Sequence, residues 1–273
     1  MINTKKFFLS IFIATVSIFS FNQCSENSLS DFNLFSISDD IQLGTQLDQE
    51  IRANQQEYPI LNDQEATSYV QNIMNQIITS PDIKYKGQFV YKVTLINTNT
   101  INAFATPGGY IYVYKGLLKY IDNEATLAAI LAHEVAHAER RHSTQRMTKA
   151  YGLQVLLGVV LGNSPSTIES IAGNLFSGLS LMYNSREDEY EADEYSFKYL
   201  QSTIWYPGAG KFFFEKIGGQ ANSSELEELF STHPLDQKRI DALNKLILDA
   251  KLSDPSESNL FSQRYLQFRG RLN

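Results

Sequence analysis

The sequence predicts one α+β domain that is mainly helical and carries a small β-sheet. Apolar residues recur at helical spacing over most of the chain, whereas two stretches between residues 89 and 114 alternate with a period of two. Breaks that contain Pro, Gly, Ser or Asn separate these stretches. At 273 residues, 43% of them hydrophobic, the chain is long enough to bury a sizeable core.

The N-terminal residues have the composition of an export signal. Two lysines precede an uncharged, largely apolar run of 15 residues, Phe7 to Phe21, which has the length of a signal-peptide core and is too short for a comfortable membrane span. The arrangement resembles a bacterial lipoprotein signal, so we expect residues 1–23 to be a signal peptide and Cys24 to be lipidated. A plain secretory signal and a retained anchor are the alternatives, because Gln23 stands where lipoprotein signals carry a small residue.

A flexible tether and two amphipathic helices are expected next. Residues 24–39 are rich in Ser, Asn and Asp and form the tether. The helices are expected from Asp40 to about Gln56 and from Asp63 to Ile78. Their apolar positions are Ile41, Leu43, Leu47 and Ile51 in the first helix and Val70, Ile73, Met74, Ile77 and Ile78 in the second.

The period then changes to two. Phe89 to Ile96 alternates in part, and Tyr110 to Tyr114 alternates cleanly, with three tyrosines on one face and two β-branched residues on the other. Thr106-Pro107-Gly108-Gly109 between them is a turn signal. These stretches predict the small sheet.

From Asn123 onward the pattern is helical. Helices are expected over Glu124 to about Met147, Leu153 to Leu161, Thr167 to about Tyr183, Arg186 to Leu200, Ala209 to Ile217 and Leu235 to Ala250. The apolar helix at 153–161 is expected to be buried; it is too short to span a bilayer, and a membrane-surface contact is the alternative. We assign residues 40–250 to one domain and residues 251–273 to a C-terminal tail.

The motif His133-Glu134-Val135-Ala136-His137 lies in the helix expected from Glu124. Residues four apart share a helix face, so both imidazoles can reach one Zn²⁺ ion at about 2.0–2.1 Å. Glu134 lies beside them and can reach a water at that ion. The neighbouring positions are apolar nearly all round, and a buried glutamate and histidines are costly unless they are paired or bind a metal. The pattern therefore predicts a zinc site with Glu134 as the catalytic base.

A catalytic zinc site usually has three protein ligands. His142 is nearest in sequence, but on a continuous helix it lies about 140° from His137 and points away from the metal. The other candidate is Glu189, which shares a helix face with Asp193; Asp193 would then accept the outer N–H of a zinc-bound histidine. A solvated acidic face is the alternative for this stretch, and it is the expected environment of Glu187, Asp188 and Glu191.

Four motifs, in order, resemble a zinc endopeptidase family that includes the integral-membrane CAAX prenyl protease, HtpX and soluble periplasmic relatives. They are Asn102 to Gly109 with Ile111, Val113 and Gly116-Leu117-Leu118; His133 to His137; Ser185 to Asp193; and Ser231 to Pro234 with Arg239-Ile240. The resemblance covers about residues 40–250. It implies a zincin-like metalloprotease fold, with the small sheet beside the helix that carries the active site.

The resemblance also implies roles for individual residues. Glu189 would be the third ligand of one Zn²⁺ per chain. Asp193 would hydrogen-bond to a ligand histidine, and His233 would lie near the metal. Glu134 would take a proton from the attacking water and pass it to the leaving amine. His233 would either stabilise the oxyanion or occupy the fourth ligand position in a resting state. The implied activity is that of a zinc metalloendopeptidase.

An extended substrate is expected to add as a strand along Gly109, Tyr110, Ile111 and Tyr112. This mode suits unfolded polypeptides, so the expected substrates are unfolded or misassembled proteins of the bacterial envelope. The expected location is the periplasmic side, through a lipid anchor in the outer membrane.

CAAX prenyl processing is disfavoured, because the several membrane spans of that branch are not found in the sequence. The alternative function is a catalytically latent, zinc-bound chaperone or assembly factor at the outer membrane. No nucleic-acid partner is expected, because the net charge is −7 and there is no basic stripe.

Overall fold

The computed structural model describes residues 32–150, 183–218 and 224–272. The described fold belongs to one compact unit, Asn33–Asn273. The expected signal peptide, the lipidation site at Cys24 and nearly all of the helices expected at 153–161 and 167–183 lie outside the described residues.

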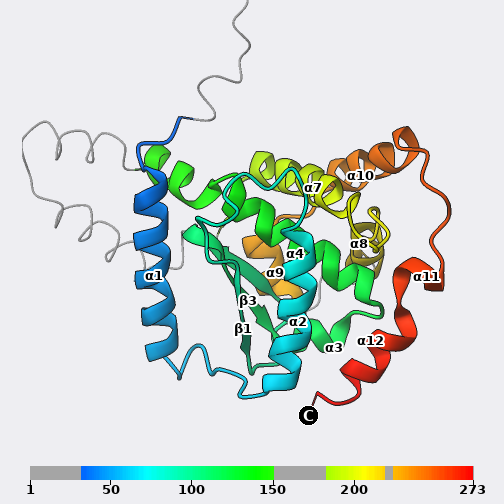
Figure 1. Cartoon of the computed structure of the whole chain (residues 1–273), viewed down its shortest axis with the longest axis horizontal. Coiled ribbons are helices and arrows are strands. Elements are labelled where there is room, and N and C mark those ends of the chain that lie inside the picture. Colours follow the sequence, from blue (N-terminus) through cyan, green and yellow to red (C-terminus); the bar gives the residue numbers. More distant parts are fainter. Residues whose placement is uncertain (1–31, 151–182, 219–223, 273) are drawn as a thin grey trace, which may run out of the picture. The chain divides into compact units, whose positions relative to one another are not determined.

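The architecture is mainly helical with one small sheet (Figure 1), which confirms the α+β prediction. The first half contains α1 (Ile37–Ala53), α2 (Gln64–Ile77), β1 (Lys92–Ile96), β2 (Ala103–Thr106), the short 3-10 helix η2 (Pro107–Gly109), β3 (Tyr110–Tyr114), α3 (Lys115–Tyr120) and α4 (Glu124–Glu139). The second half contains α7 (Arg186–Leu200), α8 (Gly210–Gly218), the 3-10 turn η4 (Ser224–Leu226), α9 (Glu227–Thr232), α10 (Gln237–Asp249), α11 (Glu257–Leu260) and α12 (Ser262–Arg269).

The sheet has the order β1-β3-β2, with β1 parallel and β2 antiparallel to β3. Ile111 on β3 pairs with Val93 on β1 and with Ala105 on β2. The expected alternation of β3 is present, because its three tyrosines belong to one buried cluster and Ile111 and Val113 to another. Both faces of β3 are therefore covered.

The central position of β3 corrects one expectation from the sequence. A substrate strand was expected along Gly109, Tyr110, Ile111 and Tyr112, but Tyr110–Tyr114 pairs with neighbouring strands on both edges. Gly109 lies in η2, before the strand begins. An added strand has no backbone groups to pair with there. β1 and β2 are the edge strands, and β2 packs against α4.

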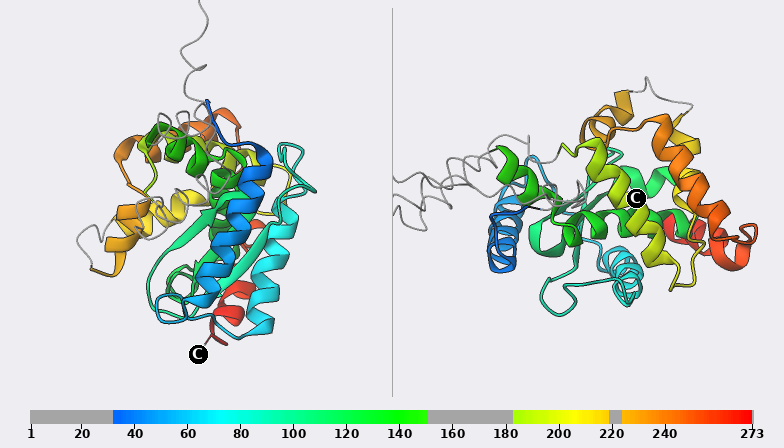
Figure 2. Two further views of the ribbon diagram at one scale, coloured as in Figure 1. Left: turned by 90° about the vertical axis from the view of Figure 1, so that its left-hand side faces the viewer. Right: turned by 90° about the horizontal axis from the view of Figure 1, so that it is seen from above.

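Helices cover both faces of the sheet (Figure 2). On the tyrosine face lies α1, where Ile51 joins the tyrosine cluster and the Tyr112 hydroxyl donates to Asp48 Oδ1 at 2.8 Å. On the other face α2 packs against β1, and α4 packs against β2 and β3. A Cβ on Gly44 of α1 would lie 1.9 Å from the Pro107 carbonyl oxygen, so only glycine allows α1 to approach η2 this closely.

The buried helix α4 begins with a side-chain cap and ends earlier than the sequence predicts. Asn123 Oδ1 accepts from the Thr126 amide at 2.8 Å, and all 16 residues of the helix are buried. A single helix was expected to run to about Met147, but α4 ends at Glu139. Arg141 adopts a left-handed conformation with φ 61°, and a new helix begins at residue 142. The break changes the direction in which the next residue points.

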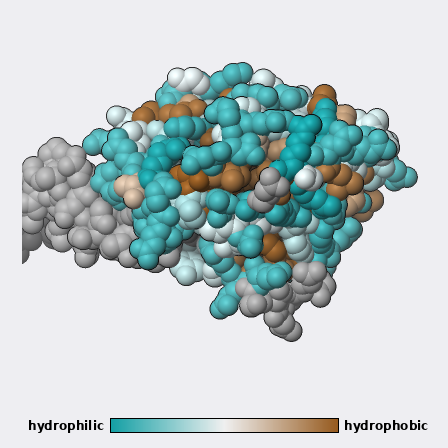
Figure 3. All heavy atoms as spheres, turned by 90° about the horizontal axis from the view of Figure 1, so that it is seen from below, coloured by the Kyte–Doolittle hydropathy of each residue, from teal (hydrophilic) through white to brown (hydrophobic). Residues whose placement is uncertain are grey.

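The C-terminal residues assigned to a tail form α11 and α12, and α12 packs on the core. Tyr265 is fully buried and donates to the Leu118 carbonyl at 2.7 Å. Phe268 stacks on Tyr69 of α2, with ring centroids 4.0 Å apart. None of the helices in the described part of the chain combines the length and apolarity needed to cross a bilayer. Figure 3 shows one face of the molecule, where hydrophobic areas lie among hydrophilic residues.

Candidate metal centre

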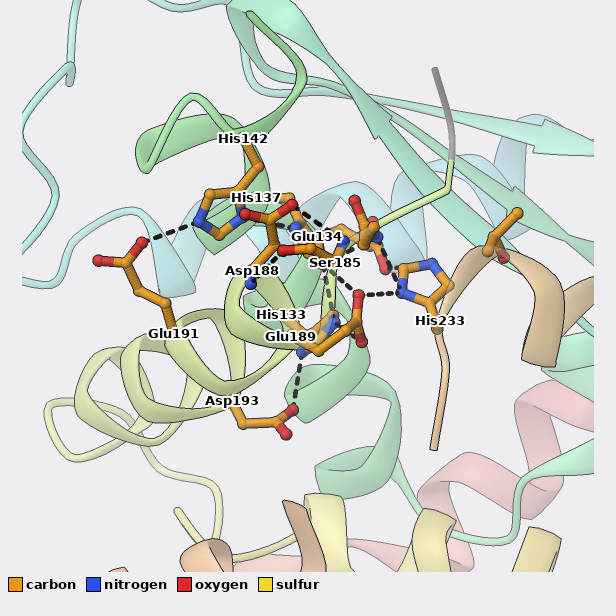
Figure 4. Close-up of polar contacts among 12 residues, drawn as sticks. His133, Glu134, His137, His142, Ser185, Asp188, Glu189, Glu191, Asp193 and His233 are labelled. Carbon is orange, nitrogen blue, oxygen red and sulfur yellow. Dashed lines mark hydrogen bonds and ion pairs between the residues drawn. The ribbon is translucent and has the colours of Figure 1, made fainter. Parts of the chain in front are cut away.

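Three elements that are distant in sequence supply the candidate site (Figure 4). His133, Glu134 and His137 lie on α4, Glu189 lies on α7, and His233 follows the last residue of α9. Ala192 of α7 is fully buried, and its small side chain lets α7 pack closely against α4. This packing brings the α7 carboxylate to the two histidines.

The donor atoms converge at the spacing that zinc requires. His133 Nε2 and His137 Nε2 lie 3.0 Å apart, and Glu189 places one carboxylate oxygen 3.3 Å from the first and the other 3.2 Å from the second. Tetrahedral ligands at about 2.0–2.1 Å from a zinc ion lie about 3.4 Å from one another. A ligand atom of His233 completes a group of four within 4.8 Å. The residues therefore fit a Zn²⁺ ion.

Hydrogen bonds at the outer ring nitrogens orient both histidines. His133 Nδ1 donates to Asp193 Oδ1 at 3.0 Å. His137 Nδ1 lies 2.7 Å from His142 Nδ1, and His142 Nε2 lies 2.8 Å from Glu191 Oε2. If each neutral ring donates outward, the hydrogens run from His137 to His142 and from His142 to Glu191. This arrangement leaves both inner Nε2 atoms free to bind a metal.

The position of His142 differs from the expectation, and so do those of two acidic residues. The chain reverses after α4, so His142 is buried against His137 instead of pointing away from the site. Glu191 was expected to be solvated, but it accepts from His142 and also from Arg140 Nε at 2.8 Å. The helical wheel failed here because α4 does not continue past Glu139.

Asp188 was also expected on a solvated face and is instead buried. Its carboxylate forms a capping box with Ser185 at the start of α7 and lies 3.1 Å from Arg146 Nη1. Glu187 is exposed, as expected.

Arg239 is a functional candidate that sequence reasoning did not identify as such. It is 4% exposed, and its Nε and Nη2 donate to Asp193 at 2.7 and 2.8 Å. Its Nη1 also lies 2.6 Å from Glu189 Oε2. One guanidinium therefore fixes two buried carboxylates, and the Arg239-Ile240 motif was the only sequence signal that pointed to it.

Electrostatics keep Glu189 and His137 in the forms that bind a metal, whereas in the metal-free chain they favour the protonated form of His133. Burial alone would raise the pKa of Glu189, but His233 and Arg239 hold it well below its usual range. Burial lowers the pKa of His137 well below its ordinary value, which keeps this ring neutral. Burial would also lower the pKa of His133, but its carboxylate neighbours raise it to about 10. The field at that ring therefore favours a positive charge.

Glu134 and His233 lie beside the converging donors. Glu134 is buried, burial raises its pKa, and its Oε2 has no hydrogen-bond partner among the described residues. His233 Nδ1 lies 3.0 Å from Glu189 Oε1, and its Nε2 lies 3.2 Å from the Ala103 carbonyl oxygen. Asn184, which sequence reasoning missed, places its amide nitrogen 3.3 Å from both His137 Nε2 and His233 Nδ1.

Comparisons with known proteins agree with this site. The chain is 30% identical over 222 residues to the Beta-barrel assembly-enhancing protease of Escherichia coli, a match that covers 77% of this chain and 44% of that protein. It is 29% identical over 189 residues to the Mitochondrial metalloendopeptidase OMA1 of Schizosaccharomyces pombe, which covers 68% of this chain and 54% of that protein. The chain thus spans about half the length of these relatives. The family model described as Peptidase family M48 matches residues 64–247, so the chain belongs to peptidase family M48.

Proposed function

We propose that this chain is a zinc-dependent metalloendopeptidase with a zincin-like fold, in which His133, His137 and Glu189 hold one Zn²⁺ ion. The observation that carries the proposal is the convergence of these three side chains at zinc spacing, next to a buried glutamate. Glu134 has an oxygen that finds no partner in the described part of the chain, and it is the base for that site. Membership of a peptidase family supports the reaction type.

Different side chains have different roles in peptide hydrolysis. A bound Zn²⁺ would polarise the scissile carbonyl and lower the pKa of water to about 7. Glu134 takes the proton of the attacking water on Oε2 and passes it to the leaving amine. Asp193 and His142 keep the two ligand histidines in the correct orientation, and Arg239 keeps Glu189 and Asp193 ionised.

His233 has two alternative roles in this scheme. One of its ring nitrogens belongs to the converging group, and four protein ligands would leave no open position for a substrate at the metal. That arrangement supports the second candidate function, a latent zinc-bound chaperone or assembly factor. Once displaced from Glu189, His233 would instead be placed to stabilise the oxyanion.

We also propose that an extended substrate adds to the outer edge of β2. This strand lies at the edge of the sheet, packs against α4, and contributes Ala103 to the cavity that Glu134 also lines. His233 Nε2 lies at hydrogen-bond distance from the Ala103 carbonyl oxygen, so displacement of His233 would free this backbone acceptor for the substrate.

Unfolded or misassembled envelope proteins are the proposed substrates in a role in protein quality control, and the name of the first relative, which refers to β-barrel assembly, supports this choice. We place the chain in the soluble periplasmic branch of the family, anchored to the outer membrane through lipidated Cys24. Comparing envelope proteins with and without the gene tests this assignment. Uncleaved envelope proteins should accumulate without the gene, and an unchanged envelope proteome would refute the assignment.

Metal removal tests the reaction. The chain should hydrolyse casein, lose that activity after treatment with a zinc chelator, and regain it with one equivalent of Zn²⁺. Hydrolysis that is unaffected when the zinc content reaches zero would exclude the proposal. The His233→Ala variant separates the two roles of this histidine: activity rises if His233 closes the metal site and falls if it stabilises the oxyanion.

A further inference from the structure

We propose that the cavity beside Glu134 is a specificity pocket for one large apolar side chain of the substrate. The inference rests on the proposed peptidase function, and it names the peptide bonds that the site would select.

The cavity lies among α4, α7, α8, α9 and α10 and contains about 700 Å³ of empty space, including its open mouth. The side chains that make its walls apolar are Ile130, Phe197, Phe213, Phe214, Ile217 and Leu243. These apolar walls suit an aromatic or large aliphatic side chain.

The pocket is continuous with the candidate metal centre. His133, Glu134 and His233 line the same cavity as the apolar residues of α8 and α10. A side chain that enters it therefore belongs to a residue next to the bond that the water activated by Glu134 attacks.

Apart from the groups at the candidate metal centre, where Glu134 Oε2 has no partner among the described residues, the polar side chains of the wall already have hydrogen-bond partners. Arg239 and Asp193 form a two-point ion pair at 2.7 and 2.8 Å. The Ser196 hydroxyl donates to the Ala129 carbonyl at 2.9 Å. In the part of the pocket away from the metal centre, a charged substrate side chain would lose its hydration without gaining a partner, whereas an apolar one loses nothing by leaving water.

This preference would make the site selective for unfolded chains. Large apolar side chains are mostly buried in folded proteins and become accessible when the protein unfolds or fails to assemble. Recognition of such a side chain requires no sequence motif in the substrate.

Peptides that differ at one position test the pocket. The full-length, zinc-loaded chain should cleave next to Leu or Phe with a kcat/KM about tenfold or more above that for Ala, Lys or Asp. Equal cleavage next to Lys or Asp would overturn the inference.

Two Leu→Ala variants on α10 supply a matched comparison. Leu243→Ala enlarges the pocket and should shift the Phe-to-Leu ratio of kcat/KM toward Phe, whereas Leu248→Ala, 75% exposed, should leave the ratio unchanged. Ile217→Phe fills the pocket and should shift the ratio toward Leu. Circular dichroism identifies variants that fold; unchanged ratios in both folded pocket variants would contradict the assignment.

A binding measurement separates this inference from the peptidase proposal. The zinc-loaded Glu134→Gln variant should bind N-acetyl-phenylalaninamide in an NMR titration, and the further change Ile217→Phe, which fills the pocket, should weaken that binding. If the amide binds and no peptide is cleaved by the unsubstituted chain, the pocket stands and the proposed function fails. If peptides are cleaved without an apolar preference, the pocket assignment fails. It also fails if a second probe, the fatty acid decanoate, binds and the amide does not.

Discussion

Each of the two histidines that face the metal is held by a hydrogen bond at its outer ring nitrogen. For His137 that partner is His142, whose other nitrogen lies 2.8 Å from Glu191. Replacing His142 with Phe keeps an aromatic ring but removes the partner. We predict that zinc affinity falls about 10–100-fold, as measured by competition with a chromophoric chelator. Glu187→Gln, on the exposed face of α7, should leave the affinity unchanged; a folded His142→Phe variant with normal affinity would refute the orienting role.

Arg239 lies between Asp193 and Glu189, and it is almost fully buried. Arg239→Met would leave two buried carboxylates without their cation. We predict a loss of about 3–5 kcal/mol in the free energy of unfolding of the metal-free chain, measured in urea. Lys238→Met, at the exposed neighbouring position, should change stability by less than about 0.5 kcal/mol. A similar loss in both variants would mean that the ion pairs are not responsible.

The stability lost in Arg239→Met should also depend on pH. The pKa values of Glu189 and Asp193 are lowered in the folded, metal-free protein, in which Arg239 is one cause. A carboxylate with a lowered folded-state pKa stabilises the fold above its unfolded pKa of about 4 and loses this contribution as the pH falls through the folded value. The stability difference between the parent chain and Arg239→Met should therefore be constant near neutral pH and shrink below about pH 4. A difference that does not shrink in acid would point to packing instead of charge.

The side chains at the metal differ in how far the sequence predicts them. His133 and His137 follow from a spacing of four on one helix, which depends only on local geometry. The role of Glu189 as a ligand could be assigned only from the resemblance to a family, because no local rule places α7 against α4. The contacts of His142 and Arg239 depend on a helix break and on the packing of α10, and neither leaves a periodic signal.

Among the elements, α12 shows how a short helix can matter more than its sequence pattern suggests. Its eight residues are mostly polar, and only Tyr265 and Phe268 are buried. Tyr265→Ala should cost about 3–5 kcal/mol, measured by chemical denaturation, because it removes a fully buried ring and its bond to Leu118. Leu266→Ala, 43% exposed beside it, should be nearly neutral. If the two variants unfold alike, α12 does not stabilise the domain.

Only part of the sheet could be predicted, because a strand shows its period only when it is long enough. Tyr110–Tyr114 alternates over five residues and was identified by its period. Ala103–Thr106 has only four residues, too few for a period, and resemblance alone pointed to it. The order β1-β3-β2 comes from pairing between distant segments, so the edge strands could not be assigned from the strand pattern.

At the scale of the whole molecule, the site exists only when the domain is folded. Its donors come from the middle of α4, from α7 and from the end of α9, and the apolar pocket adds walls from α8 and α10. The composition and helical periodicity predicted the mainly helical class. The convergence of these elements on one point is a property of their packing.

The most direct test compares the chain with its Glu134→Gln variant in two measurements, zinc content and casein hydrolysis. Gln keeps the size of Glu134 but cannot accept a proton from water. We predict about one zinc per chain in both proteins and a hydrolysis rate at least about 100-fold lower in the variant. Equal hydrolysis by both proteins at equal zinc content would contradict the role of Glu134 as the catalytic base.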